Sequence, residues 1–421
     1  MKSAFKINIS NISIKTIILI CFLCIEVGKL INSQLFSDSF ISIYLLIVNI
    51  LNIYLVRNNK PLLIVLLFIT YANYSICLPN YLSYFSGDFF VSWTPSNISS
   101  TGLNILAVFS TFLFLLTPKI KGNDNFFFDG TSNMWISRII LISLLIILLI
   151  SIPKMLVSGR GQISTIFEYS IILFIIGLYY SDKNKTIKMF YLLVGILYIL
   201  IDLMSGNRAT SIQLCIAFYL IFWINRFSVK QLIILLFIGL LVFSSVGVVR
   251  NNITTISIGK MINQILNNKL VFDTAYSAYF TSLTFIKTAL TTSFHTKLLM
   301  FISFMIYIFS GINLFNANLP TYTRNFFVHY FGGLYPIYGY FYFGIIGVFI
   351  FLFYLILIIR KINNINVTSN GFTKCLVILV VSTVPRWYLY SPFQITRNIF
   401  LMWVFWYLIK IIDDFTKKKY L

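Results

Sequence analysis

The chain has 421 residues, of which 59% are hydrophobic, and it carries a formal net charge of +21. A soluble protein of this length could not bury so large an apolar fraction, so the composition indicates a polytopic membrane protein. The positive charge does not indicate nucleic-acid binding, because the lysines concentrate in short loops between apolar runs, as expected for cytoplasmic loops.

The apolar runs predict about twelve membrane-spanning helices, each roughly as long as a bilayer is thick. In chain order the expected spans cover residues 16–31, 40–56, 62–78, 102–117, 135–152, 165–180, 191–204, 209–224, 232–249, 337–359, 374–387 and 398–412. Lysines before the first run and after the last place both termini in the cytoplasm. We therefore expect one all-α integral membrane domain over residues 1–421.

Residues 251–336, between the ninth and tenth expected spans, are predicted to form one large extracytoplasmic loop. The loop contains an apolar piece at 298–309. The span before this region ends outside and the span after it starts outside, so the region must cross the membrane an even number of times. The apolar piece is also short for a span, so we expect a re-entrant or interfacial segment. If it does cross, residues 273–290 are the candidate for one further helix.

Arginine is distributed differently from lysine. On the expected topology six of the ten arginines face outward, against six of the 22 lysines. Outward cations run against the positive-inside rule, and the guanidinium fork binds phosphate oxygens bidentately, so these arginines are candidates for function. The alternative is that they snorkel to lipid phosphates. The six are Arg160, Arg208, Arg250, Arg324, Arg386 and Arg397.

The segment Ser205-Gly206-Asn207-Arg208 stands at the boundary between two expected spans. The connector between the following two spans is short, which makes them antiparallel neighbours and returns Arg208 and Arg250 to the same membrane face. Two guanidinium groups at one face are predicted to clamp a phosphorylated lipid head group. Asp202, close to Arg208 in the sequence, either orients that guanidinium or makes a simple surface ion pair.

The two histidines, His295 and His329, both fall in the expected outer loop. Histidine titrates near neutral pH and serves as a base or proton shuttle. His329 is the stronger candidate, because Arg324 lies five residues before it and Gly332-Gly333 follow at once. A structural or incidental loop histidine is the alternative.

At these residues the chain resembles the O-antigen polymerases of the Wzy type, which polymerise oligosaccharide repeat units. The resemblance covers most of the chain in topology and about three short patches in sequence. One departure is Asn207 before Arg208, and the loop offers no match that selects one histidine. The matching patches are Ser205-Gly206-Asn207-Arg208, Val249-Arg250, and Gly332-Gly333-Leu334-Tyr335-Pro336 leading to Tyr342-Phe343-Gly344-Ile345-Ile346-Gly347.

The resemblance implies a glycosyltransferase of the bacterial plasma membrane. It would move a growing glycan from undecaprenyl diphosphate to the next lipid-linked repeat unit on the outer face, making O-antigen or capsular polysaccharide. The donor carries its own diphosphate, so neither a nucleotide sugar nor a cofactor is expected. His329 is the expected base, with Asp273, Glu168 and His295 behind it. Arg208 and Arg250 are expected to be catalytic cations as well as substrate contacts. The expected substrate-binding residues are Arg208, Arg250, Arg324, Arg386, Arg397, Tyr322 and Tyr335.

The expected partners are lipid-linked oligosaccharides, the bilayer and a polysaccharide chain-length regulator, which the family is expected to have. The outer side has no cluster of carboxylates, which indicates a metal-independent reaction. A lipid-linked oligosaccharide flippase is one alternative; charges at outer helix ends and one long loop favour the enzyme. An O-antigen ligase is another, because it shares the arginines and a loop histidine and differs in its acceptor. A small-solute transporter predicts an internal repeat, which the sequence does not show.

Overall fold

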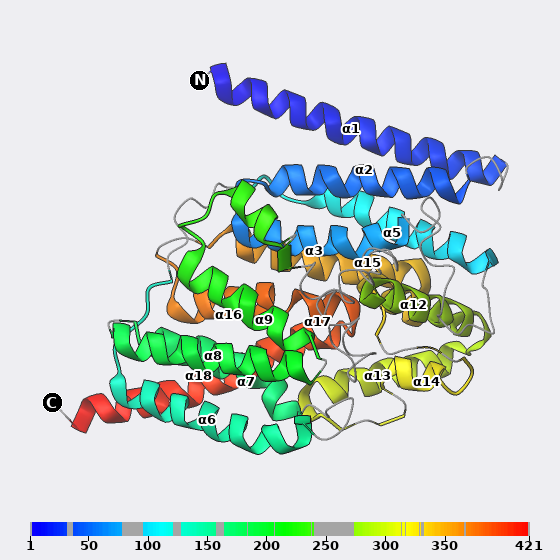
Figure 1. Cartoon of the computed structure of the whole chain (residues 1–421). Coiled ribbons are helices and arrows are strands. Elements are labelled where there is room, and N and C mark those ends of the chain that lie inside the picture. Colours follow the sequence, from blue (N-terminus) through cyan, green and yellow to red (C-terminus); the bar gives the residue numbers. More distant parts are fainter. Residues whose placement is uncertain are drawn as a thin grey trace, which may run out of the picture. The chain divides into compact units, whose positions relative to one another are not determined.

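The computed structural model describes residues 2–31, 37–77, 96–120, 128–156, 164–182, 184–205, 207–236, 238–239, 273–312, 314–315, 317–327, 329, 332–365 and 368–419. These residues form sixteen helical segments and one isolated antiparallel bridge, between Ser132 and Ser181. The predicted all-α fold class is confirmed for this part of the chain (Figure 1).

Six helices within the described ranges are long and apolar enough to cross a membrane, as expected for a polytopic membrane protein. They are α2 (Asp38–Val56), α5 (Ser96–Leu116), α6 (Met134–Leu156), α8 (Lys185–Met204), α15 (Tyr335–Asn363) and α18 (Phe393–Lys419). Shorter apolar helices are α3 (Lys60–Cys77), α7 (Thr165–Tyr180), α9 (Ala209–Phe218), which continues into the π-helical η1 (Tyr219–Trp223), α13 (Phe294–Ser310) and α16 (Gly371–Ser382). The remaining elements are α1 (Lys2–Ile31), α12 (Asp273–Thr291), α14 (Leu319–Thr323) and α17 (Val384–Leu389).

Large apolar side chains remain exposed along the outer faces of several of these helices. On α6, Ile142, Ile146 and Leu149 are 56%, 50% and 66% exposed, and they recur at the spacing of one helix face. A soluble monomer rarely exposes such a continuous apolar stripe, whereas lipid tails solvate it without cost. The stripe supports the assignment of α6 as a lipid-facing helix.

Polar residues fix where several helices begin. A serine or asparagine side chain just before the helix accepts a hydrogen bond from a backbone N–H of the first turn, which would otherwise have no partner. These N-cap residues are Ser37 (α2), Ser164 (α7), Asn184 (α8), Ser293 (α13) and Asn370 (α16).

The chain packs as two compact units. Unit 1 comprises residues 1–121, 274–363 and 388–391, and unit 2 comprises residues 122–273, 364–387 and 392–421. Each unit is therefore assembled from segments far apart in the sequence.

In unit 1, α2, α3 and α5 pack together, and α15 packs on α5 and α3. A buried polar network links them. Asn73 of α3 donates to Asn49 Oδ1 of α2 (3.3 Å), Asn52 of α2 donates to the Ser110 carbonyl of α5 (3.1 Å), and the Tyr388 hydroxyl donates to Asn73 Oδ1 (3.1 Å). Interhelical hydrogen bonds of this kind hold membrane helices together where the hydrophobic effect offers little preference.

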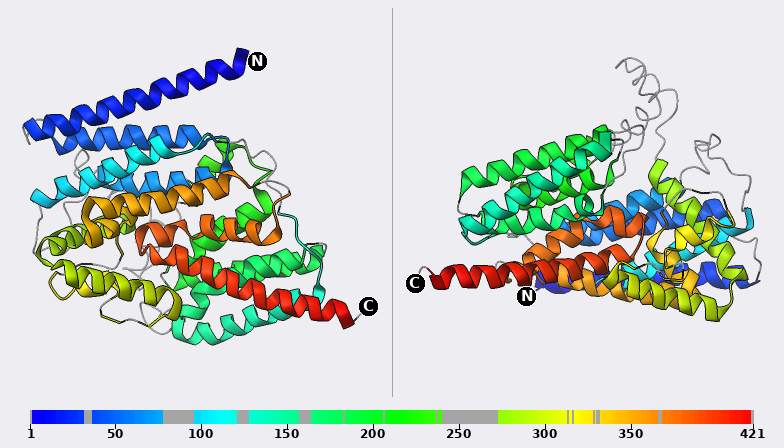
Figure 2. Two further views of the ribbon diagram at one scale, coloured as in Figure 1. Left: turned by 180° about the vertical axis from the view of Figure 1, so that it is seen from behind. Right: turned by 90° about the horizontal axis from the view of Figure 1, so that it is seen from below.

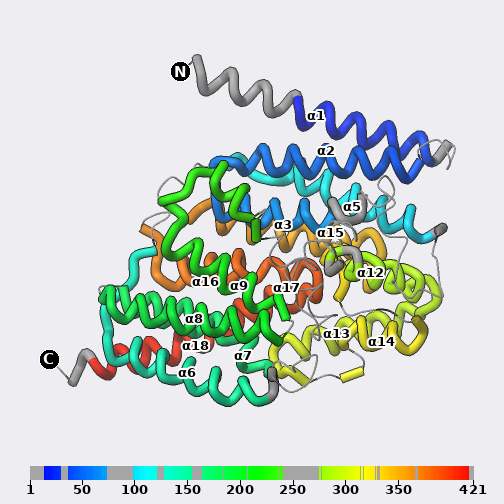
Figure 3. The backbone as a smooth tube through the Cα atoms, in the orientation of Figure 1, coloured from blue at the N-terminus to red at the C-terminus, as the bar shows by residue number. Residues whose placement is uncertain are grey.

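Helix α1 lies beside α2 and α5 in the same unit (Figure 3). The Phe22 ring packs against Tyr44 of α2 and, edge to face, against Phe112, with ring centres 6.5 and 5.8 Å apart. The outer face of α1 is apolar and exposed at Ile17, Ile20 and Leu23.

Helix α15 is a tight hairpin of two helical pieces. Phe343 and Gly344 leave helical geometry, with Gly344 at φ 60°, ψ −143°. The short piece folds back so that the Tyr335 hydroxyl donates to the Phe351 carbonyl (3.0 Å), and the Gly339 and Gly347 backbones touch where neither could carry a Cβ. The remaining piece, residues 345–363, is about 28 Å long at 1.5 Å per residue, which is still long enough to cross a bilayer.

The segment before α15 is anchored between α12 and the 388–391 segment. Gly332 has φ 115°, the Gly333 N–H donates to the Leu389 carbonyl (2.8 Å), and the Leu334 N–H donates to the Ser282 hydroxyl of α12 (2.7 Å). A Cβ at Gly333 would lie 2.4 Å from the Phe285 ring. The two glycines thus allow the chain to pass between elements too close for side chains.

The predicted outer loop, 251–336, is largely helical where it is described. The apolar piece expected at 298–309 lies inside α13, and the residues named as a further helix, 273–290, form α12. α12 is polar in sequence but buried. Its hydroxyls donate to carbonyls one turn earlier, as from Ser282 to Ala278 (2.7 Å) and from Thr288 to Thr284 (2.7 Å), so they are satisfied without water. Residues 251–272 lie outside the described ranges.

In unit 2, α6, α7, α8 and α9 form a bundle with α16 and α18, and the green helices run side by side in both views of Figure 2. Aromatic rings fill its centre: Phe174 meets Tyr198 and Phe218 edge to face, with ring centres 5.1 and 5.9 Å apart. The buried hydroxyls of Tyr191 and Tyr198 donate to the Ser137 and Leu144 carbonyls of α6 at 2.6 and 2.7 Å. This packing fixes the ends of α7, α8 and α9 relative to one another.

The hairpin in α15 generates a test of stability. Gly344→Ala introduces a Cβ at a backbone conformation that L-residues rarely adopt, although no atom lies within 4 Å of that Cβ. We expect a loss of about 1–3 kcal/mol from backbone strain alone, measured by unfolding the detergent-solubilised protein in SDS. Gly239→Ala is the matched control, because its Cβ also meets open space without a positive φ. Equal stability of the two variants would contradict the hairpin.

Candidate functional site

The Asp202 side chain organises the turn between α8 and α9. Asp202 is fully buried, and its Oδ2 accepts hydrogen bonds from the Ser211 backbone N–H (2.9 Å) and hydroxyl (2.7 Å). Arg208 is the N-cap residue of α9 but makes no side-chain cap, so the carboxylate of the preceding helix caps α9 instead. The Asn207 N–H closes the turn on the Asp202 carbonyl (3.0 Å). Asp202 thereby fixes Arg208 at the start of α9.

Arg386 of α17 bridges two helices of the same unit. Its Nη1 lies 2.6 Å from Glu168 Oε2 in the first turn of α7, and its Nη2 donates to the Thr210 hydroxyl of α9 (3.2 Å). The side chains of Arg386 and Glu168 are only 12% and 27% exposed. The ion pair is therefore mostly shielded from solvent, which strengthens it relative to a surface pair.

Arg397 of α18 approaches the same turn of α7. Its guanidinium carbon lies 5.0 Å from the centre of the Tyr169 ring, within the range of a cation–π contact. The Tyr169 hydroxyl donates to Gln394 Oε1 at 3.0 Å. Residues 168 and 169 thus bind two arginines that come from different helices.

These contacts gather charge at one end of the unit 2 bundle, where α7 begins, α8 ends, and α9 and α18 begin. Asp202 interacts electrostatically with both Arg386 and Glu168. We call this group the arginine cluster; its members are Arg208, Arg386, Arg397, Glu168 and Asp202.

Two buried atoms of the cluster have no hydrogen-bond partner among the described residues, Asp202 Oδ1 and Arg386 Nε. Buried polar groups are almost always hydrogen-bonded, so an orphaned donor and an orphaned acceptor in one cluster indicate a place that a further polar group can fill. The guanidinium donors suit a phosphate or carboxylate, and the carboxylate suits a hydroxyl. The cluster has the chemistry to bind an anion beside an alcohol.

The opposite end of the bundle carries lysine ion pairs. Lys188 pairs with Asp182, and Lys374 lies 3.4 Å from Asp129. Asn133 also donates to Asp413 there (2.7 Å). In unit 2 the arginine cluster and these lysine pairs thus lie at opposite ends of the helix bundle; which end faces outward stays a prediction.

Two of the expected outward arginines, Arg160 and Arg250, lie outside the described residues, as does Gly206. The predicted clamp of Arg208 with Arg250 therefore stays a prediction. Arg386 and Arg397 are the arginines that the structure places at the same helix ends as Arg208.

His329 and Arg324 belong to unit 1. His329 is 6% exposed, and its Nε2 shares a hydrogen bond of 2.8 Å with the Thr323 hydroxyl at the end of α14. Arg324 Nε donates to the His329 carbonyl (3.3 Å), and its side chain is exposed. Arg324 and His329 are therefore close together, through a hydrogen bond from the Arg324 side chain to the His329 backbone.

Of the other candidates, Tyr322, Tyr335 and His295 lie in unit 1, and Asp273 lies in unit 2. Tyr322 is half-buried and meets Phe326 edge to face at 5.4 Å between ring centres. Tyr335 is 1% exposed and stacks on Tyr388 inside the α15 hairpin, so its ring is part of the core. His295 is exposed at the start of α13, and Asp273 is the first residue of α12.

No group of three or more histidine, cysteine, aspartate or glutamate side chains able to hold a metal ion occurs among the residues the structure describes. Comparison with protein-family models, with characterised proteins and with solved structures finds no match for this chain.

The Glu168–Arg386 pair can be tested with a double-mutant cycle. Glu168→Gln, Arg386→Gln and the double variant are expected to give a coupling energy of about 1–2 kcal/mol, because the pair is mostly buried but not fully desolvated. Unfolding in SDS measures it. The control value is the roughly 0.3–0.5 kcal/mol typical of exposed ion pairs one helical turn apart. A coupling no larger than the control would show that the pair does not tie α7 to α17.

Proposed function

We propose that this chain is a membrane glycosyltransferase that polymerises undecaprenyl-diphosphate-linked oligosaccharide repeat units on the outer face of a bacterial plasma membrane. The observation that carries the proposal is the arginine cluster, which gathers three guanidinium groups at one end of a helix bundle and contains two buried atoms, Asp202 Oδ1 and Arg386 Nε, that have no hydrogen-bond partner among the described residues. The sequence resemblance to Wzy-type polymerases adds the reaction and the substrate class.

The chemistry requires charge stabilisation at the leaving group. The acceptor hydroxyl attacks the anomeric carbon of the donor glycan, the bond from that carbon to the diphosphate oxygen breaks, and the hydroxyl proton leaves to a base. Negative charge grows on the departing lipid diphosphate as the bond breaks. Fixed guanidinium groups stabilise that charge, with Arg208 and Arg397 contacting the phosphates and Arg386 contributing its free Nε.

The base is assigned to His329, and Glu168 is the runner-up because its carboxylate lies within the arginine cluster. The Glu168 carboxylate is already engaged in the ion pair with Arg386, whereas histidine is the side chain that most often serves as a general base. Arg250 and Arg324 remain proposed phosphate contacts, Tyr322 a proposed sugar contact, and the reaction is proposed to need no metal ion.

The proposed topology has about twelve spans, both termini in the cytoplasm, and an extracytoplasmic region over residues 251–336. Helices α12 and α13 come as a pair in that region. Whether both cross the bilayer or both lie at its surface, the number of crossings stays even and the arginine cluster stays outside. A chain-length regulator is the proposed protein partner.

The glycan profile of a strain lacking this gene tests the proposal. We expect surface glycan capped at one repeat unit, and the full ladder when the gene is restored on a plasmid. Lipid-linked units trapped on the inner face would assign a flippase instead. Long polymer left on undecaprenyl diphosphate would assign a ligase, and an unchanged ladder would exclude all three.

Arg208→Lys keeps the positive charge and removes the guanidinium fork. We expect normal protein levels and at least a tenfold loss of polymer, because an ammonium group cannot bind two phosphate oxygens in parallel. Arg138→Lys is the matched control, since Arg138 is exposed at the opposite end of the same unit, and its ladder should stay normal. Normal chains in the Arg208 variant would assign that residue to the lipid interface.

A further inference from the structure

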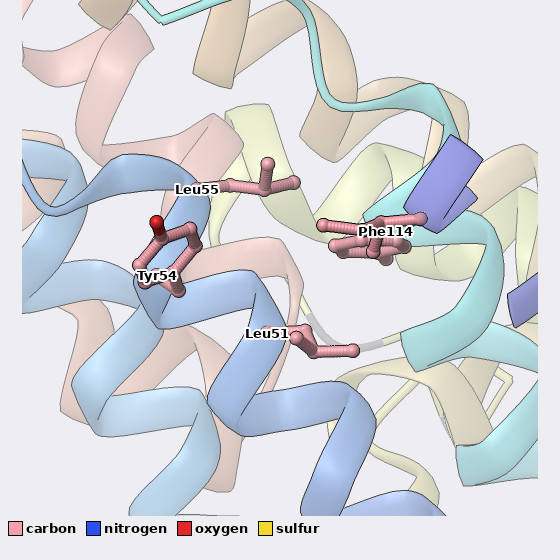
Figure 4. A pocket seen from close by; sticks show the side chains of 5 residues that line it. Leu51, Tyr54, Leu55 and Phe114 are labelled. Carbon is pink, nitrogen blue, oxygen red and sulfur yellow. The ribbon is translucent and has the colours of Figure 1, made fainter. Parts of the chain in front are cut away.

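An apolar pocket of about 270 Å³ opens in unit 1, far in sequence from the arginine cluster. In Figure 4 the side chains of Leu51 and Leu55 point from α2 toward Phe114 of α5. The pocket is lined by Ile14, Leu51, Tyr54, Leu55 and Phe114, from α1, α2 and α5. A lining of hydrocarbon and aromatic rings suits a hydrocarbon chain.

Two cations sit on the rings that line this pocket. The Lys15 ammonium lies 6.0 Å from the centre of the Phe114 ring, and the Arg57 guanidinium carbon lies 3.9 Å from the centre of the Tyr54 ring. Both are cation–π contacts. The pocket therefore has an apolar interior and positive charge against two of its five lining side chains.

Both cations retain donors for a ligand. Lys15 Nζ donates to the Leu115 and Thr117 carbonyls, each at 2.9 Å, at the end of α5. An ammonium group has three donors, so one remains. Arg57 is exposed and presents a planar fork of five donors. Neither residue forms an ion pair with a carboxylate among the described residues.

The pocket lies on a face that hydrocarbon can reach. Ile17 and Ile20 of α1 are 57% and 54% exposed, and Ile50 and Tyr54 of α2 are 53% and 52% exposed. Lys15 and Arg57 also fall on the side of the membrane that the sequence predicts to be cytoplasmic, where anionic lipids attract basic groups. A lipid tail that enters from the bilayer, with its head group at Lys15 and Arg57, accounts for both the exposed apolar face and the position of the two cations.

We propose that this pocket binds one acyl chain of an anionic phospholipid, whose phosphate is held by Lys15 and Arg57. The bound lipid bridges α1 to α2 and α5 and so stabilises the position of α1. A ligand that binds only the folded state raises stability with its concentration. The inference is independent of the proposed function, because none of these residues belongs to the arginine cluster.

The test uses the full-length protein in detergent with added phosphatidylglycerol or phosphatidylcholine of identical acyl chains. We expect phosphatidylglycerol to raise the unfolding temperature and phosphatidylcholine to have little effect. Lys15→Gln with Arg57→Gln is expected to weaken phosphatidylglycerol binding at least fivefold. The matched control is Lys119→Gln with Lys361→Gln, two exposed lysines of unit 1 that do not line the pocket. Equal loss in both double variants would overturn the proposal.

A second pair of variants tests the apolar part without changing charge. Leu55→Trp fills the pocket and should abolish the phosphatidylglycerol effect, whereas Ile50→Trp, on the exposed face of α2, should retain it. If the charge variant fails to fold, this pair decides the question. Inorganic phosphate and laurate serve as partial probes. Stabilisation by either one as large as that by phosphatidylglycerol would show that the site takes that ligand and would overturn the lipid assignment.

Discussion

The ion pair between Arg386 and Glu168 lies where three helices of unit 2 meet: α7, α9 and α17. It links α17 to the first turn of α7. A second nitrogen of the same guanidinium, Nη2, donates to the Thr210 hydroxyl at the start of α9. Asp202 caps α9 from the end of α8, and Arg397 lies over the Tyr169 ring beside Glu168. A charged side chain buried near a membrane is costly unless it is paired or binds a ligand. The groups that hold these helix ends together are also the ones proposed to bind the substrate.

Unit 1 is held by different means. Asparagine and tyrosine hydrogen bonds link α2, α3 and α5, and the α12 hydroxyls bind their own helix. Glycines then allow close packing: the Gly339 and Gly347 backbones touch, and the Gly333 backbone meets the Phe285 ring. The aromatic-Phe-Gly-x-x-Gly string that contributes to the family resemblance thus has a physical role here, because Gly344 makes the turn of α15 and Gly347 permits its close packing.

The sequence predicts the helical class and the presence of long apolar helices, because each depends on composition or on neighbours along one helix. The outward orientation of the arginines stays a prediction. The sequence does not predict that Glu168 pairs with Arg386 or that Thr210 accepts from it, since Thr210 and Arg386 are 176 residues apart. The cap of α9 was missed because it comes from Asp202, nine residues before Ser211, and not from the N-cap position. The fold-back of α15 could not be predicted, because its two pieces form one continuous apolar run in the sequence. The burial of α12 could not be predicted either, because its many hydroxyl side chains make the sequence polar.

The most direct measurement of the central claim is the affinity of the purified protein for undecaprenyl diphosphate and for undecaprenol, in nanodiscs of phosphatidylcholine. We predict that the diphosphate binds at least tenfold more tightly than undecaprenol. Arg208→Gln with Arg397→Gln should remove that preference, while Lys15→Gln with Arg57→Gln should leave it unchanged. Equal affinity for the two lipids, or an unchanged preference in the arginine double variant, would contradict the central claim.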